Sequence, residues 1–467
     1  MTARRARQGI FRFMFEIGRQ DDVTARAGLV LVAEAARAVG LDAAVEEHLE
    51  LRWRQSGYSE VDKLEAIVLL QSAGGDCIED VRILSADQGF ARILETELPS
   101  PDALHKFLAS FHDAKKLEGR PEQGAFIPEE SDALRALGRV NTAVVRAAAT
   151  STKATLDLDA TIIESHKKEA LWHYKKGRGY QPALVLWAEE ELVVADEFRD
   201  GNVPAGMQPL TAARRGFAAL PETVTERAFR GDSACDEEQL LKWLSDPQRD
   251  GPQGRIAFSI SADMTAPLVT ICQNATGWKP LEDRVRETVE WTEVEFFPGD
   301  WKKSADPLRY IALKITKKQR EIFDETPAIK HLAVVTNRWE IAGDEVVRWH
   351  WAKAGTIEHA HDVMKNELGA GTMPSKLFGA NAAWYRICGL TFNVLTFLKR
   401  RALPERLRRA RPARLRFELF TMPARLAAPA GQLVVKPNAA SGIAAEMIEA
   451  RGRLLAILEA REAAALH

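Results

Sequence analysis

The spacing of apolar residues changes twice along the chain, and this change constrains the fold more than any other feature of the sequence. Up to about residue 150 the apolar residues recur at helical spacing. Between about 150 and 340 they alternate with polar residues or form short runs of β-branched and aromatic side chains, and beyond 345 helical spacing returns. The pattern predicts an α/β protein with a β-rich centre between helical parts.

The amino-terminal helices are predicted from their start and stop signals. Ser59 and Ser100 are suitable N-cap residues, and Gly40 and Gly74 are suitable stops. The predicted helices cover 26–41, 59–75 and 100–111. Upstream of them, the alternating Phe11, Phe13 and Phe15 predict one short strand. This part is therefore expected to be an almost entirely α-helical module.

The central part is expected to contain most of the strands. The residues at 182–188 and 191–198 predict a hairpin around Glu189 and Glu190. Other predicted strands lie at 154–163, from 226, and at 256–261, 266–273, 289–297, 309–316 and 331–339. Helices follow at 356–368 and 381–400, and the tail has a short β-like segment and a final helix. We find no internal repeat in the sequence.

Composition sets the broad class of protein. The chain has 467 residues, of which 46% are hydrophobic and 28% charged, as expected for a globular protein. Its four cysteines, Cys77, Cys235, Cys272 and Cys388, are widely spaced, so a disulfide scaffold and a cysteine-rich zinc site are both disfavoured. No apolar run is long enough to span a membrane, and no secretion signal is recognisable. We expect a reduced protein of the bacterial cytoplasm.

Three segments with acidic residues could carry chemistry. Asp157 and Asp159 alternate with apolar residues, so they point to one face of a strand, although that pattern alone favours a solvated edge strand over a metal site. Asp232 follows a predicted strand, where an active-site carboxylate and an ordinary helix N-cap are equally good interpretations. Glu358 lies four residues before Asp362 on one helical face, which alone would be a solvated surface.

Taken in order, these segments resemble the DDE-type insertion-sequence transposases. DLDAT resembles the first motif of that family with Asp159, FRGDSA the second with Asp232, and TIEHAHDVMK the third with Glu358 and Lys365. Trp351 and Ala354 depart from the Tyr and Arg that usually precede the Glu, and Lys353 is the nearest cation. This departure puts DNA positioning in doubt, while metal binding is unaffected, and an inactive copy is a minority interpretation.

The resemblance implies an RNase H-like mixed-sheet catalytic core, a β-rich insertion domain and an all-α amino-terminal domain. The expected segments are a helical DNA-binding region at 1–130, the core at 131–250 and 341–400, the insertion at 251–340 and a basic carboxyl-terminal region at 401–467. The expected activity is DNA transposition. The enzyme would bind the terminal inverted repeats, cleave the ends by hydrolysis and transfer the 3′-hydroxyl ends to target DNA.

The resemblance also implies a two-metal site. Asp159, Asp232 and Glu358 would hold two Mg²⁺ ions, for which Mn²⁺ can substitute, because hard cations prefer carboxylate oxygens and paired ions stabilise the attacking and leaving oxygens of a phosphodiester. The partner would be double-stranded DNA, at the transposon ends and at the target. Because two ends must be joined, a homodimer is expected in the synaptic complex, which is associated with the nucleoid while it is bound to DNA.

Basic residues supply the expected DNA contacts. Lys365 and Lys353 lie near the third motif, and a basic segment at 166–178 also carries Trp172 and Tyr174 as stacking surfaces. The remaining predicted contacts are Lys167, Lys168, Lys175, Lys176, Arg178, Arg400, Arg401, Arg408 and Arg409. The net charge of −2 hides these segments, since 399–416 alone has nine basic residues and one acidic residue.

Other aromatic and imidazole side chains are given ordinary roles. His350, His359 and His361 surround the third motif, but His-x-His on a helix is not the spacing of zinc ligands, so we interpret them as surface or DNA-facing residues. Trp278, Trp291 and Trp301 of the insertion are interpreted as packing residues. Two functions remain as alternatives to a transposase: an inactive, transposase-derived DNA-binding protein, and a stand-alone metal-dependent nuclease.

Overall fold

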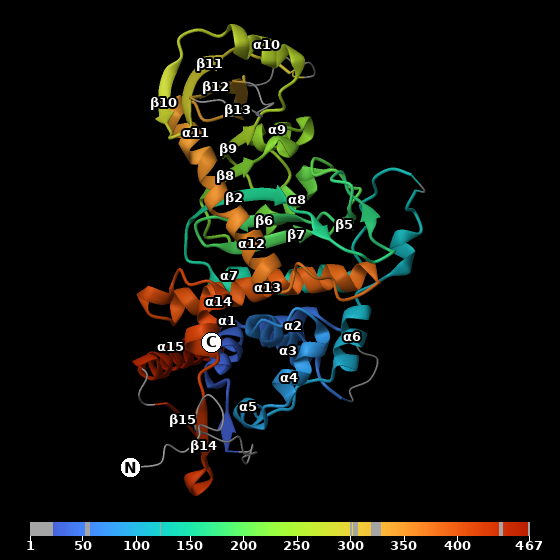
Figure 1. The fold of residues 1–467 in the computed structure, drawn as a ribbon, viewed down its shortest axis with the longest axis vertical. Helices are drawn as coiled ribbons and strands as arrows, with labels where there is room; N and C mark the ends of the chain where they lie inside the picture. The colour runs from blue at the N-terminus through green and yellow to red at the C-terminus, as the bar shows by residue number, and fades with distance from the viewer. Residues whose placement is uncertain are drawn as a thin grey trace, which may run out of the picture.

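The computed structural model describes residues 22–51, 57–121, 123–298, 301, 307–318, 328–438 and 442–465. The predicted strand with Phe11, Phe13 and Phe15 lies outside these residues. Along the long axis of the molecule, a β-rich end is followed by a central sheet and then by a helical end (Figure 1). Both described ends of the chain lie at the helical end.

One mixed sheet of nine strands joins the β-rich end to the centre of the molecule. In spatial order the strands are β10 (Lys279–Asp283), β11 (Glu287–Val294), β12 (Arg309–Lys317), β13 (Ile329–Thr336), β9 (Ile256–Ser261), β8 (Glu226–Gly231), β2 (Lys153–Ala160), β6 (Ala183–Trp187) and β7 (Leu192–Glu197). A small separate sheet contains β3 (Ile163–Glu164), β5 (Arg178–Tyr180) and β4 (Leu171–Trp172).

Five strands form the core of this sheet. β2, β6 and β7 are successive antiparallel neighbours, whereas β8 lies parallel to β2 and β9 lies parallel to β8. β7-β6-β2-β8-β9 is the strand order of an RNase H-like core, which confirms the predicted fold class. Parallel neighbours end at the same edge of the sheet, so β2 and β8 bring the residues that follow them together.

The inserted strands continue the core sheet. β13 pairs antiparallel with β9, and β12, β11 and β10 follow as an antiparallel meander. Their outer face has its own small core, which includes Val289, Ile311 and Val346. The strand predicted at 266–273 is wrong, because this segment forms helix α10 (Ala266–Asn274). Proline in its first turn and the buried pair Leu268 and Cys272, four residues apart, favour a helix over the β propensity of the segment.

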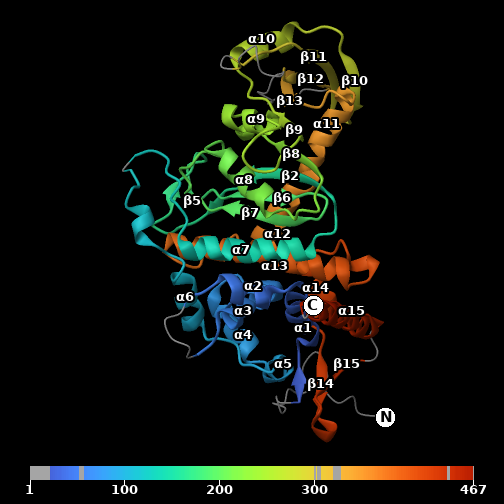
Figure 2. The same cartoon turned by 180° about the vertical axis from the view of Figure 1, so that it is seen from behind.

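Two long helices lie side by side under the central strands (Figures 1 and 2). They are α7 (Asp132–Ala148) and α13 (Phe378–Arg401). The predicted apolar stripe of α13 is buried, but so is almost all of the helix. One side of α13 contacts β7 and α7, and the other contacts the helices of the helical end. Other helices beside the sheet are α8 (Pro209–Ala219), α9 (Glu238–Ser245), α11 (Gly343–Trp351) and α12 (Ile357–Glu367).

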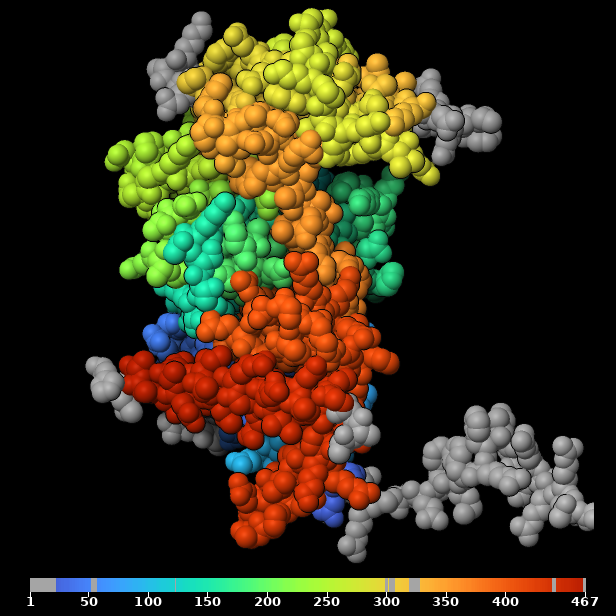
Figure 3. Space-filling model, turned by 90° about the vertical axis from the view of Figure 1, so that its left-hand side faces the viewer, coloured from blue at the N-terminus to red at the C-terminus, as the bar shows by residue number. Residues whose placement is uncertain are grey.

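The helical end combines amino-terminal and carboxyl-terminal segments. It contains α1 (Val30–Val39), α2 (Leu41–His48), α3 (Glu60–Ala73), α4 (Val81–Ser85), α5 (Gln88–Leu94), α6 (Pro101–Ala109), α14 (Pro412–Leu415) and α15 (Gly442–Ala465). A three-stranded sheet, β1 (Val23–Thr24), β14 (Ala424–Ala427) and β15 (Val434–Pro437), also joins both ends of the chain. From one side, the carboxyl-terminal segment covers most of the amino-terminal helices (Figure 3).

The predicted helix signals are present in this region. Ser59 caps α3, since its hydroxyl oxygen accepts a hydrogen bond from the backbone N–H of Asp62 at 3.0 Å. Gly40 and Gly74 follow α1 and α3 with φ of 87° and 93°, a backbone conformation that favours glycine. None of the helices in the described ranges is long and apolar enough to cross a membrane.

Candidate active site

The sheet places Asp159 and Asp232 at neighbouring strand ends. In the parallel pair β2 and β8, Asp157 lies opposite Arg230 and Leu158 lies opposite Gly231. Asp159 and Asp232 are the next residues of the two strands. Burial raises the pKa of Asp232, and the Asp159 carboxylate raises it further, while Lys353 opposes both effects. The two carboxylates are therefore close enough to repel each other.

The local turn after β8 depends on Gly231 and Asp232. A Cβ atom on Gly231 would lie 2.5 Å from the Cβ of Cys235, so only glycine allows the chain to turn here without a clash. One oxygen of Asp232 accepts the backbone N–H of Ala234 at 3.1 Å and caps the short 3₁₀ helix Ser233–Cys235. The N-cap interpretation of Asp232 is thus confirmed, and its other carboxylate oxygen is not used by the cap.

Asp157 has a different environment from Asp159. Its side chain is fully buried, and Arg230 binds both carboxylate oxygens, at 2.7 and 2.8 Å. The hydroxyl of Thr356 donates a further hydrogen bond to Asp157. Arg230 also donates to the carbonyl of Trp349 at 2.7 Å. Asp157 therefore joins β2 to β8 and to the start of α12, and both of its carboxylate oxygens are engaged in hydrogen bonds.

Helix α12 packs across β2 and β6 and carries the segment that resembles the third motif (Figure 1). Thr356 bonds to Asp157, His361 lies near the backbone carbonyl of Asp159, and Lys365 donates to the carbonyl of Ile162 at 2.8 Å. Glu358 precedes His361 by three residues and Lys365 by seven, so the three form one stripe of the helix. His361 and Lys365 lie near the end of β2, whereas the Glu358 side chain is exposed to solvent.

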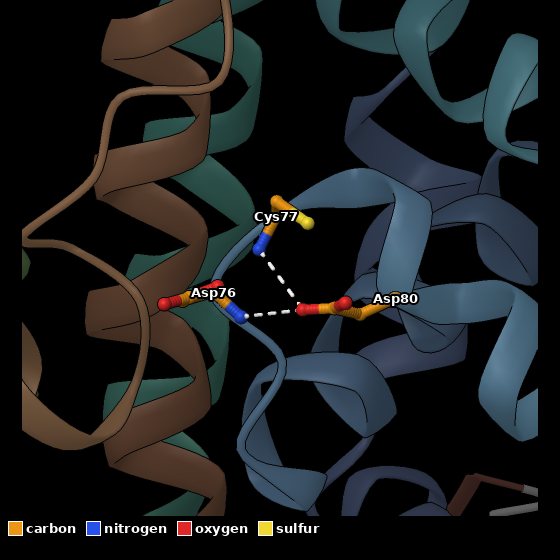
Figure 4. Close-up of side chains that lie close together, drawn as sticks. All are labelled: Asp76, Cys77 and Asp80. Atoms are coloured by element: carbon orange, nitrogen blue, oxygen red, sulfur yellow. Dashed lines mark hydrogen bonds between the residues drawn. The ribbon is translucent and has the colours of Figure 1, made fainter.

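Glu358 is exposed on the first turn of α12 and forms no hydrogen bond or ion pair with any residue that the structure describes. It does not form a tight group of ligand atoms with Asp159 and Asp232. In the described ranges, the one set of three acidic, cysteine or histidine ligand atoms within 4.8 Å of one another is Asp76, Cys77 and Asp80 (Figure 4).

The Asp76, Cys77 and Asp80 cluster is explained by a turn. One carboxylate oxygen of Asp80 accepts the backbone N–H groups of Asp76 at 3.2 Å and Cys77 at 3.4 Å. Figure 4 shows both hydrogen bonds reaching the same side chain. An aspartate that accepts upstream backbone N–H groups is a common feature of such turns. Sequence analysis did not identify this cluster, and its contacts point to a structural role.

Lys353 lies beside the two aspartates. It belongs to the 3₁₀ helix Ala352–Gly355 between α11 and α12, and its Nζ atom is 3.8 Å from Oδ2 of Asp159. Its side chain is only 12% exposed. The predicted departures Trp351 and Ala354 flank it, and Trp351 stacks against Arg284 with 4.8 Å from the guanidinium carbon to the ring centroid. The cation near the third motif thus faces the carboxylates.

The basic segment 166–178 contains both free and engaged cations. Lys168, Lys175 and Lys176 are exposed, as are Trp172 and Tyr174. Lys167 donates instead to the carbonyl oxygens of Met373 and Ser375, the latter at 3.0 Å. Arg178 donates to the carbonyls of Lys168 and Ala170 and stacks on Trp172. Three lysines and two aromatic rings of this segment therefore face solvent.

The predicted arginine contacts lie at the end of α13 and beyond it. Arg400, Arg401, Arg408 and Arg409 are all exposed. Arg400 forms an ion pair with the buried Glu190 at 2.7 Å, and Arg408 pairs with Glu405 at 2.6 Å. Arg401 lies over the ring of Phe397. About half of the positive charge of this group is thus balanced by carboxylates of the same molecule.

The surface interpretation of His350 and His361 is wrong. His350 is buried between the hydroxyls of Ser259 and Ser261, at 2.7 and 2.9 Å, and burial lowers its pKa to about 4. Burial lowers the pKa of His361 to about 3. Helical spacing could have indicated the burial of His361, since His361 follows the apolar Ile357 by four residues. His359 is exposed, as predicted.

The tryptophans of the insertion are packing residues, as interpreted. Trp291 and Trp301 are buried, and Trp278 packs against the main core. Sequence analysis missed the residues that fix the geometry of the candidate site. Arg230 and Thr356 connect Asp157 to the neighbouring elements, and the only signal for Arg230 was its position on the same strand face as Asp232.

The chain is similar to a known protein family and to a solved structure. Residues 18–455 match the family described as transposase DDE domain group 1. No curated protein matches the chain. Among solved structures, the piggyBac transposase synaptic complex with hairpin DNA is similar, with 11% identity, a TM-score of 0.42, and coverage of 84% of this chain and 77% of that one.

Proposed function

The chain belongs to the transposase family with a DDE domain of group 1, and on that premise we propose that it cuts the ends of its own element and joins them to target DNA. The observation that carries this proposal is the position of Asp159 and Asp232 at the ends of two neighbouring parallel strands, with Glu358 on the first turn of helix α12, which packs against β2. A purely DNA-binding protein has no need for two carboxylates that repel each other.

The donor set fits hard divalent cations. Asp159, Asp232 and Glu358 offer only carboxylate oxygens, which suit Mg²⁺ and also Mn²⁺. Asp159 accepts one local hydrogen bond, from the backbone N–H of Ala160 at 2.9 Å, so most of its lone pairs remain available. When bound, two such ions would supply an activated water and stabilise charge on the attacking and leaving oxygens.

Residues of the chain would align the DNA with this site. Lys365 is held by the carbonyl of Ile162, two residues beyond the end of β2, where a scissile phosphate would lie. Lys168, Lys175 and Lys176 would contact the backbone further away, and Trp172 and Tyr174 would stack on exposed bases. Two such chains would form the synaptic complex, because two element ends must be held together.

The test is a strand-transfer assay with purified protein, Mg²⁺ and DNA that carries the terminal inverted repeats. We expect joined products with the wild type and none with Asp159→Asn or Asp232→Asn, while both variants still bind the ends. Asp362→Asn is the matched control, since Asp362 lies on α12 but pairs with Arg411 at 2.6 Å, away from the aspartates. It should retain wild-type activity within about threefold.

The other outcomes assign different functions. End binding without cleavage by the wild type would replace the proposal with a DNA-binding protein. Cleavage without joined products would replace it with a nuclease. Cleavage retained by Asp159→Asn would contradict the assignment of the carboxylates. A Glu358→Gln variant tests the third position, and we expect it to lose cleavage to the same extent as Asp232→Asn.

A further inference from the structure

Lys353 is the cation shared by the two aspartates. Its Nζ atom lies 3.8 Å from Asp159 and also attracts the Asp232 carboxylate. The remaining contacts of these carboxylates are backbone N–H groups, one for each side chain. In the part of the chain that the structure describes, Lys353 is the one positive side chain that pairs with either of them. The single ammonium group of Lys353 thus acts on both carboxylates, and its charge also reaches Asp157, which Arg230 already neutralises.

The ammonium group of Lys353 is held differently from the guanidinium of Arg230. Arg230 is fixed by two hydrogen bonds to Asp157 and one to Trp349, all between 2.7 and 2.8 Å. The Lys353 ammonium makes no hydrogen bond to a described residue, and 3.8 Å from Asp159 is an ion-pair distance only. Lysine is also a point charge on a flexible stem. Lys353 can therefore move away from the carboxylates without breaking a hydrogen-bond network.

The position of Lys353 in the chain makes such a movement possible. It lies in the four-residue 3₁₀ helix between α11 and α12, and its carbonyl accepts the Thr356 hydroxyl at 2.9 Å. This contact fixes the backbone of Lys353, whereas no hydrogen bond to a described residue fixes its ammonium group. The side chain is 12% exposed, compared with 20% for Asp159, so both groups border solvent.

We propose that Lys353 is a displaceable counter-ion, which neutralises the aspartates in the metal-free protein and is expelled when a divalent cation binds. The inference rests on the proposed function, because it assumes that Asp159 and Asp232 hold the cation. Two consequences follow from Coulomb repulsion between like charges. Lys353 weakens metal binding, and its ammonium becomes available to a DNA phosphate only after the metal has entered.

The test measures Mn²⁺ binding to the DNA-free protein, by the loss of the electron paramagnetic resonance signal of free Mn²⁺. Removing a nearby positive charge should strengthen binding, so we expect Lys353→Met to bind Mn²⁺ on the order of tenfold more tightly than the wild type. Lys353→Arg keeps the charge and should bind as the wild type does. Lys242→Met is the control, because the Lys242 ammonium pairs with Glu238 on α9 and not with the aspartates.

Three outcomes decide between the possibilities. Tighter binding by Lys353→Met alone supports the counter-ion role. Equal or weaker binding by Lys353→Met, with binding lost in Asp232→Asn, overturns the counter-ion role and leaves the proposed metal site intact. Binding unaffected by Asp232→Asn overturns both. If Lys353→Met does not fold, as judged by circular dichroism, Lys353→Gln gives the same comparison with a polar side chain.

Discussion

Two carboxylates on the same face of β2, two residues apart, have opposite roles. Asp157 is fully buried and its two oxygens are bound by Arg230, whereas Asp159 borders solvent beside Lys353. Burial raises the pKa of Asp157, and the hydrogen bonds from Arg230 counteract it. The difference between the two residues lies in their partners, because their strand and their side-chain chemistry are the same.

This difference predicts a large effect on stability for one aspartate and a small effect for the other. Asp157→Asn leaves the buried Arg230 without its carboxylate, so we expect a loss of about 3 kcal/mol in the free energy of unfolding. Asp159→Asn removes repulsion from Asp232 and should change stability by less than about 1 kcal/mol. Urea unfolding without metal measures both values. Wild-type stability in Asp157→Asn would show that the buried ion pair does not hold the strands together.

The pH dependence of stability should depend on His350. Burial lowers the pKa of His350 to about 4, below its usual value of 6.5, so the folded protein keeps this ring neutral. The unfolded chain binds a proton below pH 6.5, and stability is therefore lost as the pH falls from 6.5 toward 4. At pH 5 this loss is about 2 kcal/mol.

His350→Gln removes this source of pH dependence. Glutamine does not titrate, so the difference in unfolding free energy between pH 7 and pH 5 should shrink by about 2 kcal/mol in this variant. Thermal or urea unfolding at the two pH values gives the comparison. His359→Gln is the control, since His359 is exposed on α12 and should leave the difference unchanged.

For single residues, the sequence predicted on which face of the strand Asp159 lies, but not which side chains surround it. Alternation with apolar residues placed Asp157 and Asp159 on one side of a strand, as the structure shows. The Arg230 partner lies on β8, and only the register of the parallel pair places it opposite Asp157. The pairing of distant strands is not encoded in local periodicity, so the choice between the two aspartates depended on the family resemblance.

At the scale of elements, a side chain satisfies backbone hydrogen-bonding groups on the outer side of the edge strand β7. The amide oxygen of Asn393 on α13 accepts the backbone N–H of Val193 at 2.7 Å, and its nitrogen donates to the Val193 carbonyl at 2.8 Å. The same nitrogen donates to Asn141 on α7 at 2.9 Å. One buried amide thus replaces the strand that β7 lacks on its outer side and connects it to two helices.

Asn393→Leu should separate packing from hydrogen bonding at this edge. Leucine has a similar volume, but it leaves the Val193 backbone N–H and the side-chain oxygen of Asn141 without their partner. We therefore expect a loss of about 2–4 kcal/mol, by the usual cost of unsatisfied buried groups of about 1–3 kcal/mol each. Urea unfolding measures this loss in the free energy of unfolding. Thr391→Val on the same helix breaks one hydrogen bond, to Gln71, and serves as the comparison with a smaller loss.

Start and stop signals predicted several helices, because caps act within a few residues. Ser59 and Ser100 as N-caps, and Gly40 and Gly74 as helix stops, depend only on local backbone geometry. The prediction of a strand for α10 was wrong, because the helix-starting proline outweighs the β propensity of the segment. The burial of α13 on all sides could not be predicted from its stripe, because it depends on which elements pack against the second face.

At the scale of the whole molecule, the two ends of the chain share one hydrophobic core with the central sheet. Leu31 of α1, Leu156 of β2 and Leu454 of α15 belong to the same buried cluster. The amino-terminal helices therefore depend on the carboxyl-terminal segment for part of their packing. Periodicity within each segment gave no sign of this, because contacts between distant segments leave no periodic signal.

The charge of the whole molecule gives a prediction for DNA binding. The net charge is −2, so DNA affinity must come from local cations. Each lysine that contacts a phosphate contributes about 0.9 to the slope of log affinity against log salt concentration. Lys168, Lys175 and Lys176 are exposed, so replacing all three with alanine should reduce the magnitude of the slope by about 2 to 3.

Lys167→Ala is the matched control in the same segment. The Lys167 ammonium is held by the carbonyls of Met373 and Ser375, and burial lowers the pKa of this group. It is therefore not free to release a counter-ion from DNA, and its removal should leave the slope within about 0.3 of the wild type. Fluorescence anisotropy with an end-containing duplex at several salt concentrations measures the slopes. Equal slopes for the triple variant and the wild type would place the DNA on another face of the molecule.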